Sequence, residues 1–169
     1  PPIYLATLRD RMLALAAEIA DGAIWANSSL SHVSTQLAAV PSARKEGFFL
    51  SNMVPTVIDD DREAARAVNR RTLTGYVSLP NYRNYWRAAG YVEEMDAIET
   101  ALDAGDREKV TSLMSDRWLD DCTISGPAAF VRERMAEWSA SGVHPIAVMS
   151  STSGGQAKAI GELFAAYSG

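Results

Sequence analysis

Short apolar runs alternate four times with helix-length segments along this chain of 169 residues. Such alternation predicts parallel strands that are joined by helical crossovers. Strands that are apolar throughout, rather than alternating between apolar and polar residues, are typical of sheets that are covered on both faces. The pattern therefore predicts an α/β fold whose four parallel strands lie at Ile3–Thr7, Ala23–Ala26, Phe48–Ile58 and Pro145–Met149.

Apolar residues at helical spacing predict which faces of the first and last helices are buried. In a first helix, from about Arg9 to Ala20, the expected inward face is formed by Met12, Leu15, Ala16 and Ile19. In a last helix, from about Gln156 to Tyr167, the expected inward face is formed by Ala157, Ile160, Phe164 and Tyr167. Asn27 or Ser28 is the expected cap of a further helix that ends near Ala39.

The stretch from Asp59 to Val143 separates the third and fourth strands and is far longer than one crossover helix needs. Capping residues at Asp60, Asp106 and Ser125 predict that it is mainly helical. The helix that begins at Ser125-Gly126-Pro127 is expected to bury Val131, Met135 and Trp138. We therefore predict a single domain over residues 1–169 with a helical insertion at about 59–125.

Composition and charge exclude several classes of protein. The net charge is −5 and the 16 Lys and Arg residues are scattered, so a nucleic-acid partner is not expected. No apolar run reaches the roughly 18 residues of a membrane helix, and no signal peptide is visible, so we expect a cytoplasmic protein. Cys122 is the only cysteine, and His32 and His144 lack partners at metal-ligand spacing, so no metal site is predicted.

Several motifs in a defined order resemble the luciferase-like monooxygenase superfamily. They are Pro2-Ile3-Tyr4-Leu5-Ala6, Ala20-Asp21-Gly22, and the acidic, Ala-rich helix start from Asp59 to Arg66. The stretch from Tyr76 to Tyr82 resembles the branch of that family that uses the deazaflavin coenzyme F420. Ser125 to Val143 is similar to the helix that enters the last strand of the family's barrel.

The resemblance implies a (β/α)8 barrel, of which this chain would supply the C-terminal half and the insertion after the seventh strand. Such barrels take about 250 residues. The chain opens at Pro1 without an initiator Met, as if it were already within a strand, so we expect upstream sequence that encodes the other half. The missing N-terminal half of the barrel is accordingly an expected partner, and a homo-oligomer is also expected.

Through the resemblance, backbone amides after the first two strands of this chain would bind the cofactor phosphate. One wall would be Ala6, Thr7, Leu8 and Arg9, and the other Ile24, Trp25, Ala26 and Asn27. N–H groups at a helix start favour anions. The first turn of the family is usually rich in Gly, whereas Leu8-Arg9 stands here, so Arg9 could instead contact phosphate by charge.

Other candidates have simpler structural interpretations. Trp25 could line the cofactor ring, although a Trp that ends a buried strand usually belongs to the core. The polar run Ser150–Gly155 could form an anion-binding nest, or a flexible loop with a capping Ser. No nucleophile–base pair is visible, which fits an enzyme whose cofactor carries the chemistry, and the catalytic residues stay unassigned.

Two classes of function remain open. The first is an oxidoreductase that transfers hydride between F420 and a small organic substrate, with an FMN-dependent monooxygenase as its alternative. The second is a non-catalytic half-barrel that serves as an interaction module. The substrate itself is not encoded in any motif of the chain.

Overall fold

The computed structural model describes residues 1–168, which form one parallel sheet, nine α-helices and one short 3-10 helix. The strands are β1 (Tyr4–Ala6), β2 (Gly22–Ala26), β3 (Phe49–Ile58), β4 (Ile124–Gly126) and β5 (His144–Ser150). The sequence predicted four of them and missed β4, because three residues are too short to show a periodicity. The predicted α/β class and the helical insertion between the last two long strands are confirmed.

All strand pairs in the described residues are parallel, as predicted. β1 pairs with β2, β2 with β3, and β3 with both β4 and β5. Residues 51–53 of β3 pair with β2 and β5, and residues 56–57 pair with β4 and β5. Because a strand has two edges, β2 and β4 share one edge of β3 and β5 takes the other. Pro55 lies in the interval between β2 and β4, so it does not interrupt the strand.

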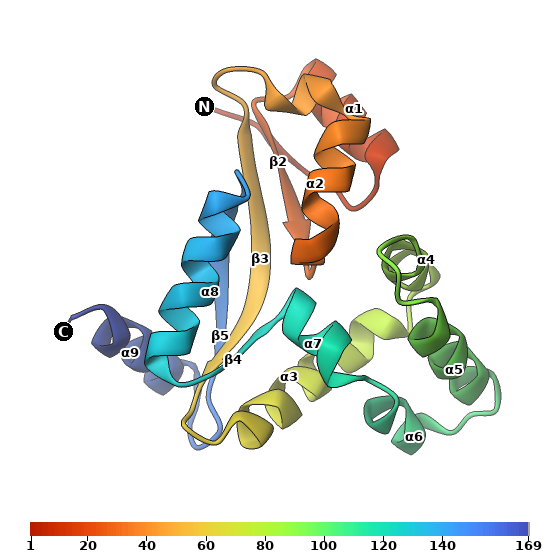
Figure 1. The fold of residues 1–169 in the computed structure, drawn as a ribbon, viewed down its shortest axis with the longest axis vertical. Helices are drawn as coiled ribbons and strands as arrows, with labels where there is room; N and C mark the ends of the chain where they lie inside the picture. Colours follow the sequence, from red (N-terminus) through yellow and green to blue (C-terminus); the bar gives the residue numbers. More distant parts are fainter. Residues whose placement is uncertain (169) are drawn as a thin grey trace.

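Helices that follow the strands pack on one face of the sheet. They are α1 (Asp10–Ile19), α2 (Leu30–Ala39), the 3-10 helix Pro41–Arg44, α8 (Ala128–Ala140) and α9 (Gln156–Tyr167). Figure 1 shows α1 and α2 beside β2, and α8 alongside β3 and β5. The first residue of α2 is Leu30 and its N-cap is Ser29, so neither Asn27 nor Ser28 caps it.

The insertion consists of five helices at the lower end of β3 (Figure 1), which is the end where its residues approach Ile58. They are α3 (Arg62–Val77), α4 (Pro80–Ala88), α5 (Val92–Asp103), α6 (Arg107–Ser112) and α7 (Asp116–Cys122). The N-cap of α3 is Asp61, one residue after the predicted Asp60, and Asp106 caps α6 as predicted. Ser125 and Gly126 belong to β4 rather than to the start of α8, whose N-cap is Pro127.

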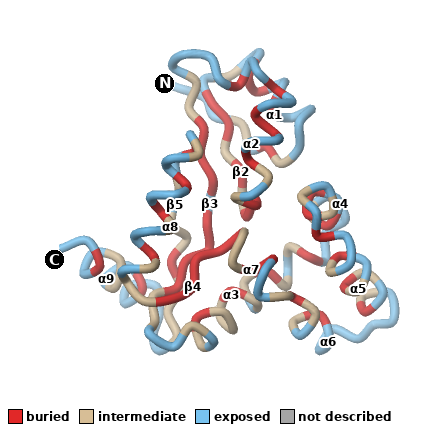
Figure 2. The backbone as a smooth tube through the Cα atoms, in the orientation of Figure 1, coloured by how far each residue is buried: buried red, intermediate tan, exposed pale blue. Residues whose placement is uncertain are grey.

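Two separate hydrophobic clusters correspond to these two parts of the chain. One joins the sheet to α1, α2 and α8 and includes Trp25 and Trp138, both fully buried. The other joins α3 to α7 around Trp86 and Trp118. Figure 2 shows the buried strands at the centre and the exposed outer faces of the insertion helices. The predicted stripe of Val131, Met135 and Trp138 is buried, as expected.

The predicted inward face of α9 is wrong, and that of α1 is confirmed only at Ala16. In α1 the buried residues are Leu13, Ala16 and Ala17, while Met12, Leu15 and Ile19 are 40–63% exposed. In α9 the buried residues are Ala159 and Ala166, while Ile160, Phe164 and Tyr167 are 42–70% exposed. The small residues of both helices lie against the rest of the structure, and the large apolar ones form exposed stripes.

The opposite face of the sheet also carries exposed apolar side chains. Leu50 and Val54 of β3 belong to the cluster under the helices, so Phe49 and Met53 face the other way because strand side chains alternate. Tyr4, Met53 and Ile146 are 40–42% exposed, and Met53 pairs in register with Ile146. We call this surface, formed by alternate residues of β1, β2, β3 and β5, the inner face.

Gly22 tests the close packing of this inner face. A Cβ at Gly22 would lie 2.4 Å from the Phe49 carbonyl oxygen and 2.8 Å from the Tyr4 ring. We predict that Gly22→Ala lowers the free energy of unfolding by about 1–3 kcal/mol through overpacking, measured by urea denaturation. Gly75, exposed in α3 with no atom near its Cβ position, is the control. Gly75→Ala should raise that free energy by about 0.4–1 kcal/mol, and equal effects of the two changes would contradict the packing.

Candidate functional site

The candidate site lies where β1 and β2 end. Because these strands are parallel neighbours, the segments that follow them lie side by side, and the Thr7 N–H donates to the Ile24 carbonyl at 2.9 Å. The structure thus brings together the two predicted segments, Ala6–Arg9 and Ile24–Asn27. Carboxyl ends of parallel strands are the edge at which such folds bind ligands.

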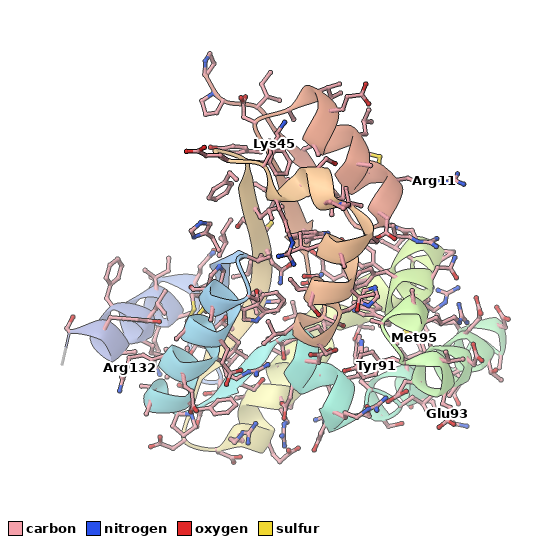
Figure 3. The ribbon with its side chains drawn as sticks, turned by 45° about the horizontal axis from the view of Figure 1, so that its top comes forward. Arg11, Lys45, Tyr91, Glu93, Met95 and Arg132 are labelled. Atoms are coloured by element: carbon pink, nitrogen blue, oxygen red, sulfur yellow. The ribbon has the colours of Figure 1, made fainter. Side chains whose placement is uncertain are left out.

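The first turn has free backbone donors. Within residues 1–168, no hydrogen bond engages the backbone N–H groups of Leu8, Arg9, Asp10 and Arg11. The N-cap Arg9 has no side-chain capping bond, and a hollow of about 550 Å³ is lined by Arg9 to Met12. The Arg11 side chain projects away from the molecule (Figure 3). Free N–H groups at the start of α1 and the two arginines favour an anion at this turn, while the Asp10 carboxylate in the same turn opposes it.

The second turn differs, because its backbone donors are already used. Ile24, Trp25 and Ala26 lie in β2 between β1 and β3, and the Asn27 N–H donates to the Met53 carbonyl at 3.0 Å. The Trp25 side chain is fully buried in the cluster under the helices, so its ring does not reach the inner face. Of the four residues predicted here, two leave a side-chain donor free: Trp25 its Nε1, which is buried under the helices, and Asn27 its Nδ2.

Asn27 has the strained conformation of this turn. Its φ is +57°, which is the left-handed region that residues other than Gly rarely adopt. Asn tolerates this conformation better than most residues. The side chain is 3% exposed, so both the backbone and the carboxamide are held by the surrounding structure.

Several buried polar atoms at this end of the sheet lack a hydrogen-bond partner. In the described part of the chain they include Thr7 Oγ1, Asn27 Nδ2, Ser28 Oγ, Ser29 Oγ and Asn52 Nδ2. An unsatisfied buried polar group costs about 1–3 kcal/mol, so such groups usually bind water or a ligand. Thr7 directly precedes the turn at the start of α1, and buried donors of this kind are chemically suited to the oxygens of a phosphate or a hydroxylated chain.

Sequence reasoning missed the residues that hold the second turn. Trp86 Nε1 donates to the Asn27 carbonyl at 3.2 Å, and the Tyr85 hydroxyl accepts from the Ser29 N–H at 3.0 Å. Both aromatic residues belong to α4, nearly sixty positions further along the chain. No local motif indicates such a contact; a Tyr-Trp pair on a helix of otherwise polar residues was the one available signal.

Asp121 of α7 occupies the start of α2. Its carboxylate accepts from the Ser31 N–H at 2.9 Å, the Ser31 hydroxyl at 2.7 Å and the Tyr91 hydroxyl at 2.7 Å. A carboxylate at a helix N-terminus uses the same donors that an anion would bind. An anionic ligand is therefore favoured at the start of α1 and disfavoured at the start of α2.

Burial shifts the ionisation of several groups near the site. It raises the pKa of Tyr85, so its hydroxyl stays protonated. Burial also lowers the pKa of His32, although Asp10 and Asp121 oppose this shift. Burial raises the pKa of the Cys122 thiol, so this thiol stays protonated and weakly reactive.

The run from Ser150 to Gly155 forms a loop whose hydroxyl groups contact the protein's own carboxylates. Thr152 Oγ1 donates to Asp59, and Ser151 Oγ donates to Glu162 at 3.2 Å. Two carboxylates beside the loop make an anion-binding nest unfavourable there. The structure supports the simpler interpretation of a polar loop before α9.

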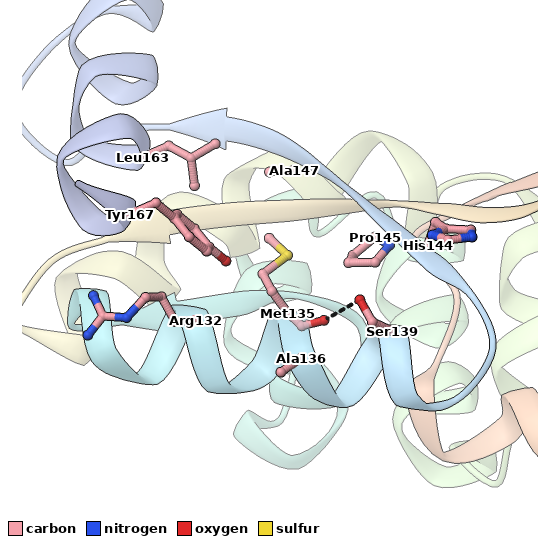
Figure 4. Close-up of a pocket in the computed structure, with 9 residues that line it drawn as sticks. All are labelled: Arg132, Met135, Ala136, Ser139, His144, Pro145, Ala147, Leu163 and Tyr167. Atoms are coloured by element: carbon pink, nitrogen blue, oxygen red, sulfur yellow. Dashed lines mark hydrogen bonds between the residues drawn. The ribbon is translucent and has the colours of Figure 1, made fainter. Parts of the chain in front are cut away.

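A second hollow of about 550 Å³ lies between α8, α9 and β5 (Figure 4). Met135, His144 and Tyr167 contribute to its lining, and Arg132 Nη1 donates to the Ala166 carbonyl there at 2.6 Å. His144 begins β5, so this hollow is near the amino end of that strand. In barrel folds that end supports stability, whereas chemistry is placed at the other end.

A parallel sheet with crossover helices, a long helical insertion and free donors at the carboxyl strand ends define an α/β protein of the barrel type. The family model of the luciferase-like monooxygenases matches residues 1–145, and the chain belongs to that family. The solved structure of the coenzyme F420-dependent tetrahydromethanopterin reductase from Methanopyrus kandleri is similar, with a TM-score of 0.72 and 20% sequence identity. The similarity covers 98% of this chain and 49% of that protein, so this chain spans about half of its length.

No match was found among curated protein sequences. Within residues 1–168, no helix is both long and apolar enough to cross a membrane. In the same residues, no group of three or more His, Cys, Asp or Glu side chains is arranged to hold a metal ion.

The left-handed backbone at Asn27 predicts which of two substitutions leaves the protein more stable. At φ +57°, Asn27→Ala should be less stable than Asn27→Gly by about 1–2 kcal/mol, because only the alanine has a Cβ that clashes there. Both changes remove the same carboxamide, so each is the control for the other in urea denaturation. In an ordinary conformation Ala would be the more stable of the two, and that result would contradict the turn geometry.

Proposed function

We propose that this chain forms the phosphate-binding side of an F420-dependent oxidoreductase that transfers hydride to or from an organic substrate. Membership of the luciferase-like family supports an oxidoreductase, and the F420-dependent reductase is a structural neighbour. The observation that carries the proposal is the start of α1, where four backbone N–H groups are free beside Arg9 and Arg11.

The residues present fit a phosphorylated cofactor. The free N–H groups from Leu8 to Arg11 and the Arg9 guanidinium would hold the phosphate, and Thr7 Oγ1 and Asn27 Nδ2 would bind neighbouring oxygens. Leu8 is half-buried and Arg9 has a side chain where the family usually has Gly, so close approach of the backbone is hindered. Recognition by charge is therefore expected to contribute more here than recognition by the backbone alone.

When it is bound, a reduced deazaflavin would supply a hydride to an electrophilic carbon of the substrate, and a proton from solvent would complete the reduction. The residues of this chain would bind and orient the cofactor, while the insertion covers the carboxyl ends of the strands. An insertion in that position can exclude water and select a small-molecule substrate. The groups that contact the reacting atoms are expected on the other half of the barrel.

The FMN-dependent monooxygenase remains the alternative within the same class. FMN also presents a phosphate, so the start of α1 suits it equally, and the family name itself refers to monooxygenases. Direct titration of the full-length protein with each cofactor separates the two. Tight binding of FMN without binding of F420 would replace the first proposal by the second.

A specific observation also favours an association role. The large apolar residues of α1 and α9 are exposed, and these two helices accompany β1 and β5, each of which pairs along one edge only in the described residues. The inner face adds Tyr4, Met53 and Ile146. We propose that complementary βα units cover these surfaces, supplied by the N-terminal half of the barrel or by a second copy of the chain. A non-catalytic half-barrel module would use the same surfaces.

Arg9 provides a direct test of the phosphate site. We predict that Arg9→Glu weakens binding of F420 by about tenfold or more, which is about 1.4 kcal/mol, because it places a negative charge beside the phosphate. Affinity is measured by fluorescence titration at low salt. Arg71→Glu, at an exposed position of α3, is the matched charge reversal and should leave the affinity unchanged. Unchanged affinity in Arg9→Glu would remove Arg9 from the site.

The exposed stripes lead to a prediction about assembly. We expect the isolated chain of residues 1–169 to associate at micromolar concentration in sedimentation velocity experiments. Unpaired strand edges and exposed apolar faces favour contacts between copies of the chain. Ile19→Ser and Phe164→Ser should reduce association, since these residues are 63% and 70% exposed. A compact monomer that unfolds cooperatively would show that the helices already close the core.

A further inference from the structure

One contact of the insertion with the proposed cofactor turn is made to the peptide between Asn27 and Ser28. The carbonyl of Asn27 accepts from Trp86 Nε1 at 3.2 Å, and the N–H of Ser28 donates to Asn52 Oδ1 at 3.2 Å. The peptide between Asn27 and Ser28 is therefore held at its oxygen by α4 and at its nitrogen by β3. All of these contacts are buried.

The position of the Trp86 ring is set inside the insertion. It packs edge-on against Trp118, with ring centroids 4.9 Å apart, and lies 5.4 Å from the Tyr82 ring. The side chains of Trp86 and Trp118 are both fully buried. Tyr85, the preceding residue, accepts from the Ser29 N–H at 3.0 Å and makes a second contact with the same turn.

These contacts have a geometric consequence for Asn27. A left-handed φ of +57° requires support from its surroundings, because the conformation is unfavourable for a residue with a Cβ. The Trp86 bond fixes the direction of the Asn27 carbonyl and thus the peptide plane. That backbone sets the direction in which the Asn27 side chain leaves the chain, and the Nδ2 of this side chain is buried without a partner.

We propose that Trp86 is a positioning residue that aims the Asn27 carboxamide at the bound cofactor, so that the insertion controls cofactor affinity. The inference rests on the proposed function, because it assigns Asn27 Nδ2 to the cofactor. A shift of α4 when substrate binds under the insertion would move the indole and loosen the turn. Substrate and cofactor binding would then be coupled through this one hydrogen bond.

The chain offers a matched pair of variants. Trp86→Phe and Trp138→Phe each remove a fully buried indole N–H and keep an aromatic ring. Trp86 Nε1 donates to Asn27, whereas Trp138 belongs to the other hydrophobic cluster and its Nε1 has no hydrogen-bond partner in the described residues. A loss of packing affects both variants, and a loss of positioning affects only Trp86→Phe.

Two measurements on the full-length protein test the proposal. Residue-resolved hydrogen exchange without cofactor should show faster exchange of the Asn27 and Ser28 amides in Trp86→Phe, with no change at Ile98 in the insertion core. Fluorescence titration with F420, and separately with FMN, should show affinity weakened roughly fivefold, as expected for one lost hydrogen bond. Trp138→Phe should change neither measurement at the turn.

The outcomes separate this inference from the proposed function. Equal effects of the two Trp variants on turn exchange and affinity would overturn the positioning role. Unchanged affinity in Trp86→Phe, while the unsubstituted protein binds cofactor, would overturn it alone. Binding of neither cofactor by the unsubstituted protein would overturn the proposed function and this role with it. If Trp86→Phe does not fold, Tyr85→Phe replaces it, and unchanged exchange at Ser29 would then count against the inference.

Discussion

β3 is the constraint on which the arrangement of the protein depends. It pairs with β2 and β4 along one edge and with β5 along the other, so its ten residues connect all parts of the sheet. Asn69 of α3 reinforces the junction, because its Nδ2 donates to Ser125 Oγ at 2.9 Å and to the Ile124 carbonyl at 3.3 Å. The insertion leaves β3 at its carboxyl end and returns through β4 beside the same strand. This return places its helices next to the ends of β1 and β2, where the candidate site lies.

The sheet is asymmetric in what it buries. On the helix side the cluster around Trp25 and Trp138 is closed, while on the inner face Met53 and Ile146 remain 40% exposed. Burial of a Leu- or Phe-sized side chain is worth about 1.5–3 kcal/mol, so several such residues represent a stabilisation comparable to a domain's net 5–15 kcal/mol. An inner face, two open strand edges and two apolar helix stripes all lie on surfaces that further βα units would cover. These exposed surfaces are the observation on which the proposed association rests.

The sequence predicted the strands and most helices, because their periodicity is local. It failed for the face of α9 and, apart from Ala16, for that of α1, since both helices carry apolar residues on more than one side and periodicity alone does not show which side meets the sheet. The structure shows Ala16, Ala17, Ala159 and Ala166 at those contacts, where small residues permit close approach. The two predicted segments of the site were found adjacent because parallel neighbours end at one edge. Trp86 could not be predicted, because its contact with Asn27 depends on the fold of the whole insertion.

The two turns of the candidate site differ in whether their backbone donors are available to an anion. At the start of α1 the backbone donors are free and Arg9, Asp10 and Arg11 lie beside them, whereas at the start of α2 Asp121 takes up the donors of Ser31. In the proposed binding mode, the anionic group of a ligand would lie at α1 and its uncharged polar part at the buried donors of Thr7 and Asn27. A guanidinium at an exposed turn is screened over about 8 Å at physiological salt, while buried donors are screened much less. Charge at Arg9 would therefore steer the ligand, and the buried turn held by Trp86 would determine how it is oriented.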